Sequence, residues 1–136
     1  MTPDTRLASE IDARRDDLVA LTQALVRVPT LNPPGQHYRD ICELIADRLR
    51  RSGFDCEMIR AEGTPGDSEA WPRWNLVARR TGAGPGDCLH FNGHTDVVEV
   101  GHGWTKDPFE GGTRVAPTEN AAVTWRPPMK FSMSVE

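Results

Sequence analysis

The fold of this 136-residue chain is decided by one stretch, Leu89-His90-Phe91-Asn92-Gly93-His94-Thr95-Asp96-Val97-Val98. Residues 88–91 have the apolar character of a strand, and Asn92-Gly93 is a pair suited to a tight turn with positive φ. His94 and Asp96 follow two residues apart, so in an extended segment their side chains point to the same side. We expect an imidazole and a carboxylate to converge beyond the strand, where ligands usually bind in open α/β sheets.

His94 and Asp96 are the residue types of a metal ligand and its partner. A neutral imidazole binds a metal ion through one ring nitrogen, and a carboxylate on the other nitrogen fixes the tautomer and raises the basicity. We therefore predict that His94 is a zinc ligand and that Asp96 orients it. Taken alone, the H-x-D spacing is a weak motif, because two polar loop residues without a special role would also explain it.

Two amphipathic helices are predicted before this stretch. Apolar residues recur at helical spacing over residues 9–28, where Ser9 and Asp12 resemble a capping box and Pro29 ends the helix. The second helix runs from about residue 37 to residue 51, and Gly53 follows as a stop. Its predicted buried face consists of Ile41, Leu44, Ile45 and Leu49.

After Gly53 the hydrophobic period changes to that of strands. We predict strands over residues 54–59, 75–78 and 88–91, separated by loops rich in glycine and proline. Two helices followed by strands that lead into a polar loop indicate an α/β layer. With 136 residues, the chain has the length of one domain.

The composition excludes several classes of protein. A net charge of −4 provides no basic face for nucleic acid or for an anionic membrane, and no apolar stretch is long enough to span a bilayer. No secretory signal is visible at the N-terminus. Cys42, Cys56 and Cys88 are odd in number and far apart, which favours reduced thiols in a cytoplasmic protein and provides no close pair for zinc.

The residues around His94 belong to a longer signature. N-G-H-T-D-V-V at residues 92–98 is followed by G-x-G-W at residues 101–104 and D-P-F at residues 107–109. Together with R-W-N-L-V-A at residues 73–78, this pattern closely resembles the first metal-binding signature of the M20 zinc metallopeptidases and amidohydrolases. These enzymes are of the acetylornithine deacetylase and succinyl-diaminopimelate desuccinylase type.

The resemblance implies a fold and a function. Residues 1–112 would be the N-terminal part of a three-layer α/β/α catalytic domain of the zinc-dependent exopeptidase (phosphorylase/hydrolase-like) kind, truncated in this chain. The family hydrolyses the amide bond of N-acyl amino acids or small peptides with two zinc ions, which cobalt can replace. Its pattern implies His94 as the first metal ligand and Asp96 as the catalytic aspartate that orients it.

Other residues near the signature have simpler explanations. Trp104 and residues 107–109 match family positions near the mouth of the site, but packing and turn formation also explain them. His37 is explained by helix capping or exposure, and His90 by a place on a sheet face. His102 is explained by a solvated loop.

Residues 113–136 depart from the family pattern. In complete relatives an aspartate that bridges both metals precedes a Met-Lys dipeptide in a glycine-rich turn, whereas here Pro128, which has no metal-binding side chain, precedes Met129-Lys130. The glutamate base and the other ligands of the family also have no counterpart in this chain. A change of reading frame and a truly divergent tail both explain residues 113–136, and the sequence leaves these alternatives open.

Two functions from different classes follow. The first is a metal-dependent amide hydrolase that is inactive as this chain, because a catalytic zinc takes three protein ligands and a water. The second is a non-catalytic remnant or interaction module that keeps only the front of the fold. Deacetylase, desuccinylase and dipeptidase activities cannot be separated by these residues. Unpaired strand edges further predict self-association.

Overall fold

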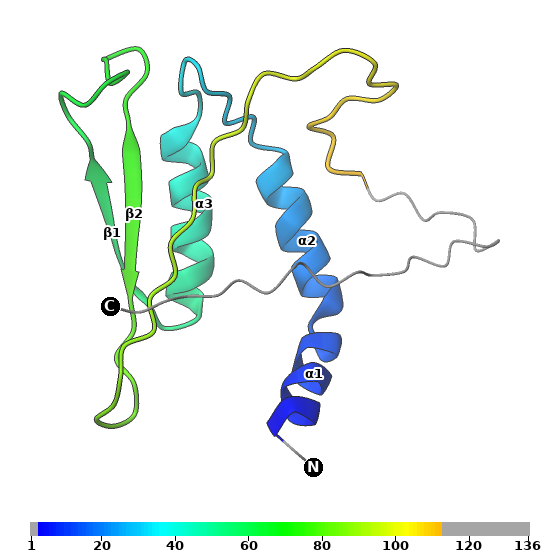
Figure 1. Cartoon of the computed structure of the whole chain (residues 1–136), viewed down its shortest axis with the longest axis vertical. Coiled ribbons are helices and arrows are strands. Elements are labelled where there is room, and N and C mark those ends of the chain that lie inside the picture. Colours follow the sequence, from blue (N-terminus) through cyan, green and yellow to red (C-terminus); the bar gives the residue numbers. More distant parts are fainter. Residues whose placement is uncertain (1–2, 113–136) are drawn as a thin grey trace, which may run out of the picture.

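The computed structural model describes residues 3–112, and residues 113–136, with Pro128 and Met129-Lys130, lie outside that range. In chain order the described elements are α1 (Pro3–Ala13), α2 (Arg15–Val26), α3 (Tyr38–Arg51), β1 (Asp55–Arg60) and β2 (Trp74–Arg79). Figure 1 shows α3 lying against the two strands, while α1 and α2 follow one another at the other side of the molecule. The described residues therefore form a small unit of helices and strands. They do not by themselves form the three layers expected of the complete domain.

Helix α3 provides the core of the described residues. Ile41, Cys42 and Ala46 are 2%, 4% and 0% exposed, whereas Leu44, Ile45 and Leu49 are only half-buried. The predicted helix over residues 37–51 is confirmed, and Gly53 follows with a positive φ of 81°. The predicted buried face was correct for Ile41 but missed Cys42 and Ala46, because small side chains allow the helix to approach the strands closely.

Strands β1 and β2 form an antiparallel pair that covers α3. The register places Met58 opposite Leu76 and Cys56 opposite Ala78, and directly opposed residues share one face of a sheet. This face meets the helix, since the Cys56 thiol approaches the carbonyl oxygen of Ala46 at 3.7 Å. Both strands were predicted from the sequence to within one residue at each end, over residues 54–59 and 75–78.

The expectation of one continuous helix over residues 9–28 is wrong. The chain forms α1 and α2, which are separated at Arg14, where φ is −105° and ψ is 11°. The Arg14 N–H donates to the carbonyl of Ile11 at 3.0 Å, which is a tighter turn than that of an α-helix. Asp16 and Asp17 occupy the first turn of α2, where acidic side chains favour a new helix start. Ser9 lies inside α1, so it caps neither helix.

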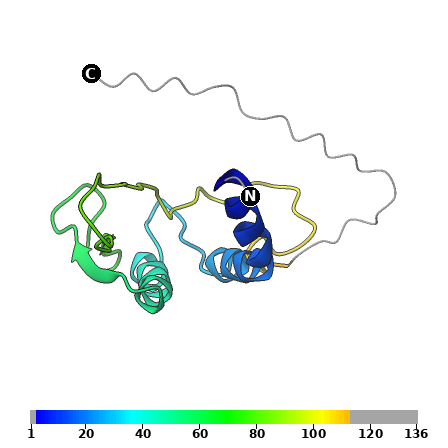
Figure 2. The ribbon, with the colours of Figure 1, turned by 90° about the horizontal axis from the view of Figure 1, so that it is seen from below.

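The α1–α2 part is separate from the part built on α3. Figure 2 shows the two parts on opposite sides of the segments that connect them. Arg48 of α3 lies 3.7 Å from Asp17 of α2, but both side chains are exposed and such a pair adds little stability. The apolar stripe of the first part is accordingly open, with Ile11 50% exposed and Leu18 49% exposed.

The predicted strand over residues 88–91 is also wrong. These residues have no regular secondary structure, and the side chains of Leu89 and Phe91 are 78% and 83% exposed. A strand requires a neighbouring strand for its backbone hydrogen bonds, and the sheet of the described residues consists of β1 and β2 alone. The expected turn with positive φ at Asn92-Gly93 is absent as well, since neither residue has a positive φ.

Within residues 3–112, no helix combines the length and the apolar character required to cross a membrane.

Asp67 stabilises the connection between β1 and β2. Its carboxylate accepts the backbone N–H of Arg73 at 2.9 Å and that of Gly63 at 3.2 Å, and the Arg60 guanidinium lies 3.7 Å away. The hydrogen bond from Arg73 is the largest of several effects that hold the pKa of Asp67 below its ordinary value, although burial of the carboxyl opposes them. The charged form is therefore favoured by folding.

We predict that Ile41→Ala lowers the free energy of unfolding by about 2–5 kcal/mol, because it leaves a cavity between α3 and the strands. A loss of this size is a large share of the total stability of a small domain. Urea unfolding monitored by circular dichroism measures it. The matched control is Leu7→Ala, at a residue that is 62% exposed in α1 and should change the unfolding free energy by less than about 0.5 kcal/mol.

We also predict that Asp67→Asn destabilises the chain at neutral pH and that its effect disappears in acid. Because the folded state lowers the pKa of Asp67, its contribution is complete above the pKa of the unfolded chain, about 3.9, and is lost as the pH falls through the folded pKa. Denaturant midpoints of the two proteins, measured from neutral pH downward, should converge. A gap that stays constant with pH contradicts this assignment.

Candidate functional site

Backbone hydrogen bonds join the segment of His94 to the loop before α3. The Val97 N–H donates to the Thr30 carbonyl at 3.0 Å, and the Asn32 N–H donates to the Val97 carbonyl at 2.9 Å. Leu31 and Val97 thereby form an isolated parallel bridge. The Thr30 side chain is 2% exposed, and its hydroxyl donates to the carbonyl of Thr95. This bridge determines where the residues just before Val97 lie.

His94 and Asp96 converge next to this bridge. The imidazole Nδ1 lies 3.0 Å from the Asp96 carboxylate oxygen Oδ1 and 3.2 Å from the Asp96 carbonyl oxygen. The His94 side chain is 84% exposed, whereas that of Asp96 is 33% exposed. Both neighbours of Nδ1 are acceptors, so Nδ1 carries the proton of the neutral ring and Nε2 keeps its lone pair.

Asn32 holds the other oxygen of the Asp96 carboxylate. The Asn32 side-chain Nδ2 donates to Asp96 Oδ2 at 2.8 Å, while its Oδ1 accepts from both terminal nitrogens of Arg73 at 3.2 Å. The hydrogen bond from the Asn32 amide lowers the pKa of Asp96 most, and the hydrogen bond from the His94 ring lowers it further. Burial of the carboxyl opposes both effects. The carboxylate is therefore ionised at neutral pH.

Arg73 is held in turn by the elements around it. Its guanidinium lies over the Tyr38 ring, 5.0 Å from the ring centroid. Gly35 and Gly66 have positive φ values of 106° and 84°, which favour glycine, and a Cβ atom at either position would displace the guanidinium. Burial, followed by the nearby charge of Asp96, raises the pKa of the Tyr38 phenol. The site thus combines the loop before α3, the first residue of α3, the residue before β2 and the segment before Val97.

Three curated relatives match the chain over most of its length. Over 97 residues, 70% of this chain, it is 42% identical to the succinyl-diaminopimelate desuccinylase of Cereibacter sphaeroides. The corresponding enzyme of Rhodospirillum rubrum is 42% identical over 94 residues, and that of Burkholderia multivorans is 37% identical over 93 residues. Over this part the chain is homologous to the M20 desuccinylases. It spans about a fifth of the length of these relatives, 21–22%.

No protein-family model and no solved structure matches the chain.

The described residues provide only some of the ligands that a metal ion of the M20 family would need. The lone pair of His94 Nε2 is one suitable donor, and the carboxylate on Nδ1 is the usual partner of such a ligand. A catalytic zinc takes three protein ligands, however, and no group of three His, Cys, Asp or Glu side chains in residues 3–112 is placed to hold an ion. The described residues alone therefore do not fit a complete metal centre.

The remaining histidines and cysteines lie apart from the pair. His37 precedes α3 and its Nδ1 lies 2.8 Å from Asp40, whereas His102 is exposed in its loop, as predicted. His90 is exposed in a segment without regular structure, so its assignment to a sheet face is wrong. The cysteines are free and form no pair: Cys42 is buried, Cys56 half-buried and Cys88 exposed.

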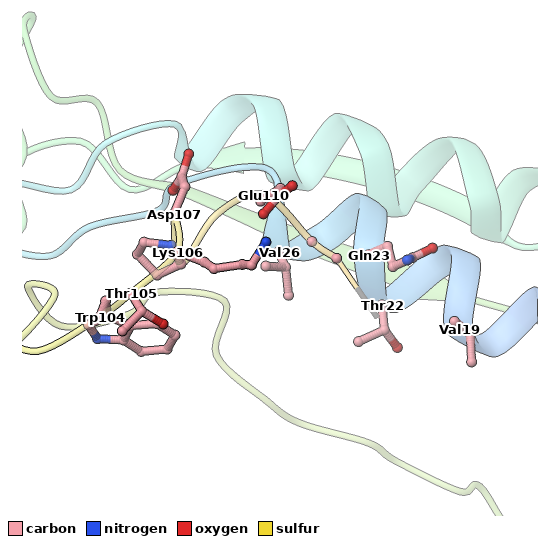
Figure 3. Close-up of a pocket in the computed structure, with 12 residues that line it drawn as sticks. Val19, Thr22, Gln23, Val26, Trp104, Thr105, Lys106, Asp107 and Glu110 are labelled. Carbon is pink, nitrogen blue, oxygen red and sulfur yellow. The ribbon is translucent and has the colours of Figure 1, made fainter. Parts of the chain in front are cut away.

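A separate groove of about 630 Å³ lies between α2 and the loop after residue 103. Figure 3 shows α2 on one side of it and Trp104, Lys106 and Asp107 on the other. The Asp107 carboxylate accepts the Phe109 N–H at 2.9 Å, which confirms turn formation by the D-P-F sequence. Trp104 is 64% exposed, so packing does not explain it. Neither His94 nor Asp96 lines this groove, so it does not extend their site.

The sequence predicted that the side chains of His94 and Asp96 converge, but it did not identify Asn32, Arg73 and Tyr38 as their neighbours. Asn32 lies in the loop before α3, and it contacts Asp96 across 64 positions of the sequence. Arg73 is the first residue of the R-W-N-L-V-A pattern, and nothing in that pattern indicates its contact with Asn32. A polar residue in a loop gives no local sign of a distant partner, so only the three-dimensional structure identifies these contacts.

We predict that Thr30→Val loosens the segment before Val97, whereas Thr30→Ser does not. Valine has nearly the same shape as threonine but lacks the hydroxyl that donates to Thr95, a loss of about 1 kcal/mol. Hydrogen exchange of the Val97 amide, which donates to Thr30, should accelerate only in the valine variant. Equal exchange in both variants contradicts a role for this hydroxyl.

Proposed function

We propose that this chain is the front part of a metal-dependent hydrolase that cleaves the amide bond of N-acyl amino acids or small peptides, as a desuccinylase does. The observation that carries the proposal is the convergence of His94 and Asp96 in a chain homologous to the desuccinylases. In this proposal residues 1–112 are the N-terminal part of a three-layer α/β/α catalytic domain, and residues 113–136 are a tail that departs from the family pattern through divergence or a change of reading frame. The free cysteines support a cytoplasmic location.

The proposed roles follow from the charges and the directions of the hydrogen bonds. His94 offers Nε2 as a ligand to a zinc ion, with cobalt as a substitute, because the Asp96 carboxylate keeps the ring proton on Nδ1. Asp96 is ionised, so it also compensates the positive charge that develops on the ring when Nε2 binds a cation. The exposure of His94 leaves Nε2 accessible to further ligands.

The 136-residue chain alone is proposed to be inactive. One imidazole does not provide the three protein ligands of a catalytic zinc. No carboxylate in residues 3–112 joins the pair as a further ligand. A non-catalytic module that keeps the front of the fold is the second candidate. The exposure of Leu89 and Phe91 favours it, because an apolar segment of this kind suits contact with another surface, including a second copy of the chain.

A chimera tests the hydrolase proposal. The 97 residues of this chain that match the Cereibacter sphaeroides desuccinylase replace the corresponding residues of that enzyme. We predict hydrolysis of N-succinyl-diaminopimelate by the chimera, and a loss in kcat/KM of about 100-fold or more in its His94→Ala variant, because the metal loses a ligand. His102→Ala, at an exposed histidine outside the pair, is the matched control and should retain the activity of the chimera.

Two outcomes contradict this proposal. A chimera that folds and binds metal like the parent enzyme but has no activity shows that the front part is not equivalent. Activity that survives His94→Ala shows that this histidine is not a ligand. The 136-residue chain assayed alone with zinc should show no turnover, and turnover with stoichiometric zinc would refute the proposed inactivity.

A further inference from the structure

In the chain of hydrogen bonds that links Arg73, Asn32, Asp96 and His94, the donor and the acceptor of each bond can be assigned. A guanidinium only donates hydrogen bonds, so the Asn32 oxygen that faces Arg73 is the amide carbonyl. The Asn32 nitrogen must then face Asp96, whose ionised carboxylate only accepts. The His94 ring nitrogen that faces the other oxygen of this carboxylate must likewise be a donor, Nδ1–H. Each orientation follows from the one before it.

We propose that Asn32 is a positioning residue for His94, and that Arg73 fixes Asn32 in that task. Asn32 binds one oxygen of the Asp96 carboxylate and thereby orients the other oxygen toward the imidazole. This orientation stabilises the neutral ring form with the proton on Nδ1 and leaves Nε2 unprotonated. The tautomer of His94 can be measured in this chain without any metal. Only the statement that Nε2 then binds a metal ion rests on the proposed function.

The surroundings explain why such a device is needed here. The His94 side chain is 84% exposed and that of Asp96 is 33% exposed, so packing alone does not fix either of them. The Asn32 backbone, in contrast, is tied to the Val97 carbonyl at 2.9 Å. The Arg73 guanidinium is enclosed by Tyr38, Gly35 and Gly66. The amide of Asn32 is therefore the fixed member of the group, and the carboxylate adjusts to it.

A rival explanation exists for the same tautomer. The backbone carbonyl of Asp96 lies 3.2 Å from Nδ1 and also accepts a hydrogen bond. If this carbonyl alone were sufficient, the proton would stay on Nδ1 whatever the carboxylate did. Removing the amide donor of Asn32 while leaving the backbone intact separates the two explanations.

Asn32→Asp makes this separation with the smallest change in shape. Aspartate keeps an oxygen for Arg73 but replaces the donor to Asp96 with a second carboxylate, which repels it. Asn32→Ala removes both contacts without adding a charge. Asn75→Asp is the matched control, because Asn75 is exposed on β2 and no side-chain hydrogen bond is found for it in the described residues.

Ring ¹⁵N chemical shifts of His94 measure the tautomer in the full 136-residue chain, labelled at histidine and held at a pH where the ring is neutral. We expect a predominantly Nδ1–H form in the parent chain and in Asn75→Asp. In Asn32→Asp and Asn32→Ala, the ratio of the two tautomers should shift about fivefold toward Nε2–H, the effect expected of one lost hydrogen bond. Backbone amide shifts in α3 and β1 should stay unchanged, which shows that folding is preserved.

Arg73→Lys tests the second half of the proposal. A lysine carries the charge but not the planar pair of donors that faces Asn32, so we expect a smaller shift of the tautomer ratio in the same direction. An unchanged ratio in both Asn32 variants overturns the proposal and leaves the Asp96 carbonyl as the determinant. An unchanged ratio in Arg73→Lys overturns the part assigned to Arg73. These measurements involve neither metal nor turnover, so they fail independently of the chimera.

Discussion

The paired backbone hydrogen bonds of Val97 are the constraint on which the candidate site depends. They bring a loop before α3 and a segment 65 positions later into contact, through Thr30 and Asn32. Without them His94 and Asp96 would lie in an open stretch of chain with no fixed relation to Arg73. A single hydrogen bond of this kind contributes only about 1 kcal/mol, so the burial of Thr30 and the side-chain contact between Asn32 and Asp96 must act together with the bridge.

Stability and chemistry are located in different parts of the described chain. The apolar core lies between α3 and the two strands, whereas the site is built from polar contacts beside it. The segment that leads to His94 contributes nothing to that core, since Leu89 and Phe91 are exposed. Such a distribution favours the second candidate function, in which this exposed apolar segment contacts another surface. The polar contacts also order His94 and Asp96 locally, although the described residues lack the other ligands that a metal ion needs.

The sequence predicted the elements whose signal is local. Helix α3 and both strands could be predicted because their apolar periods and the stop at Gly53 depend on neighbouring residues. The break at Arg14 was missed because neither proline nor glycine marks it. The strand predicted at residues 88–91 failed for the opposite reason, since a correct apolar pattern lacks a partner strand in the described residues. The pairing of His94 with Asp96 followed from their spacing, but Asn32 and Arg73 are brought to them only by the fold.

The most direct test of this account is a nuclear Overhauser measurement on the 136-residue chain in solution. We expect cross-peaks between the side-chain amide protons of Asn32 and the β protons of Asp96, because these groups are joined by a hydrogen bond of 2.8 Å. A further cross-peak is expected between the Val97 amide proton and Thr30, since this amide donates to the Thr30 carbonyl. Absence of both, with the signals of α3 and β1 intact, would show that the segment of His94 is not held against the loop before α3, and the site described here would not exist.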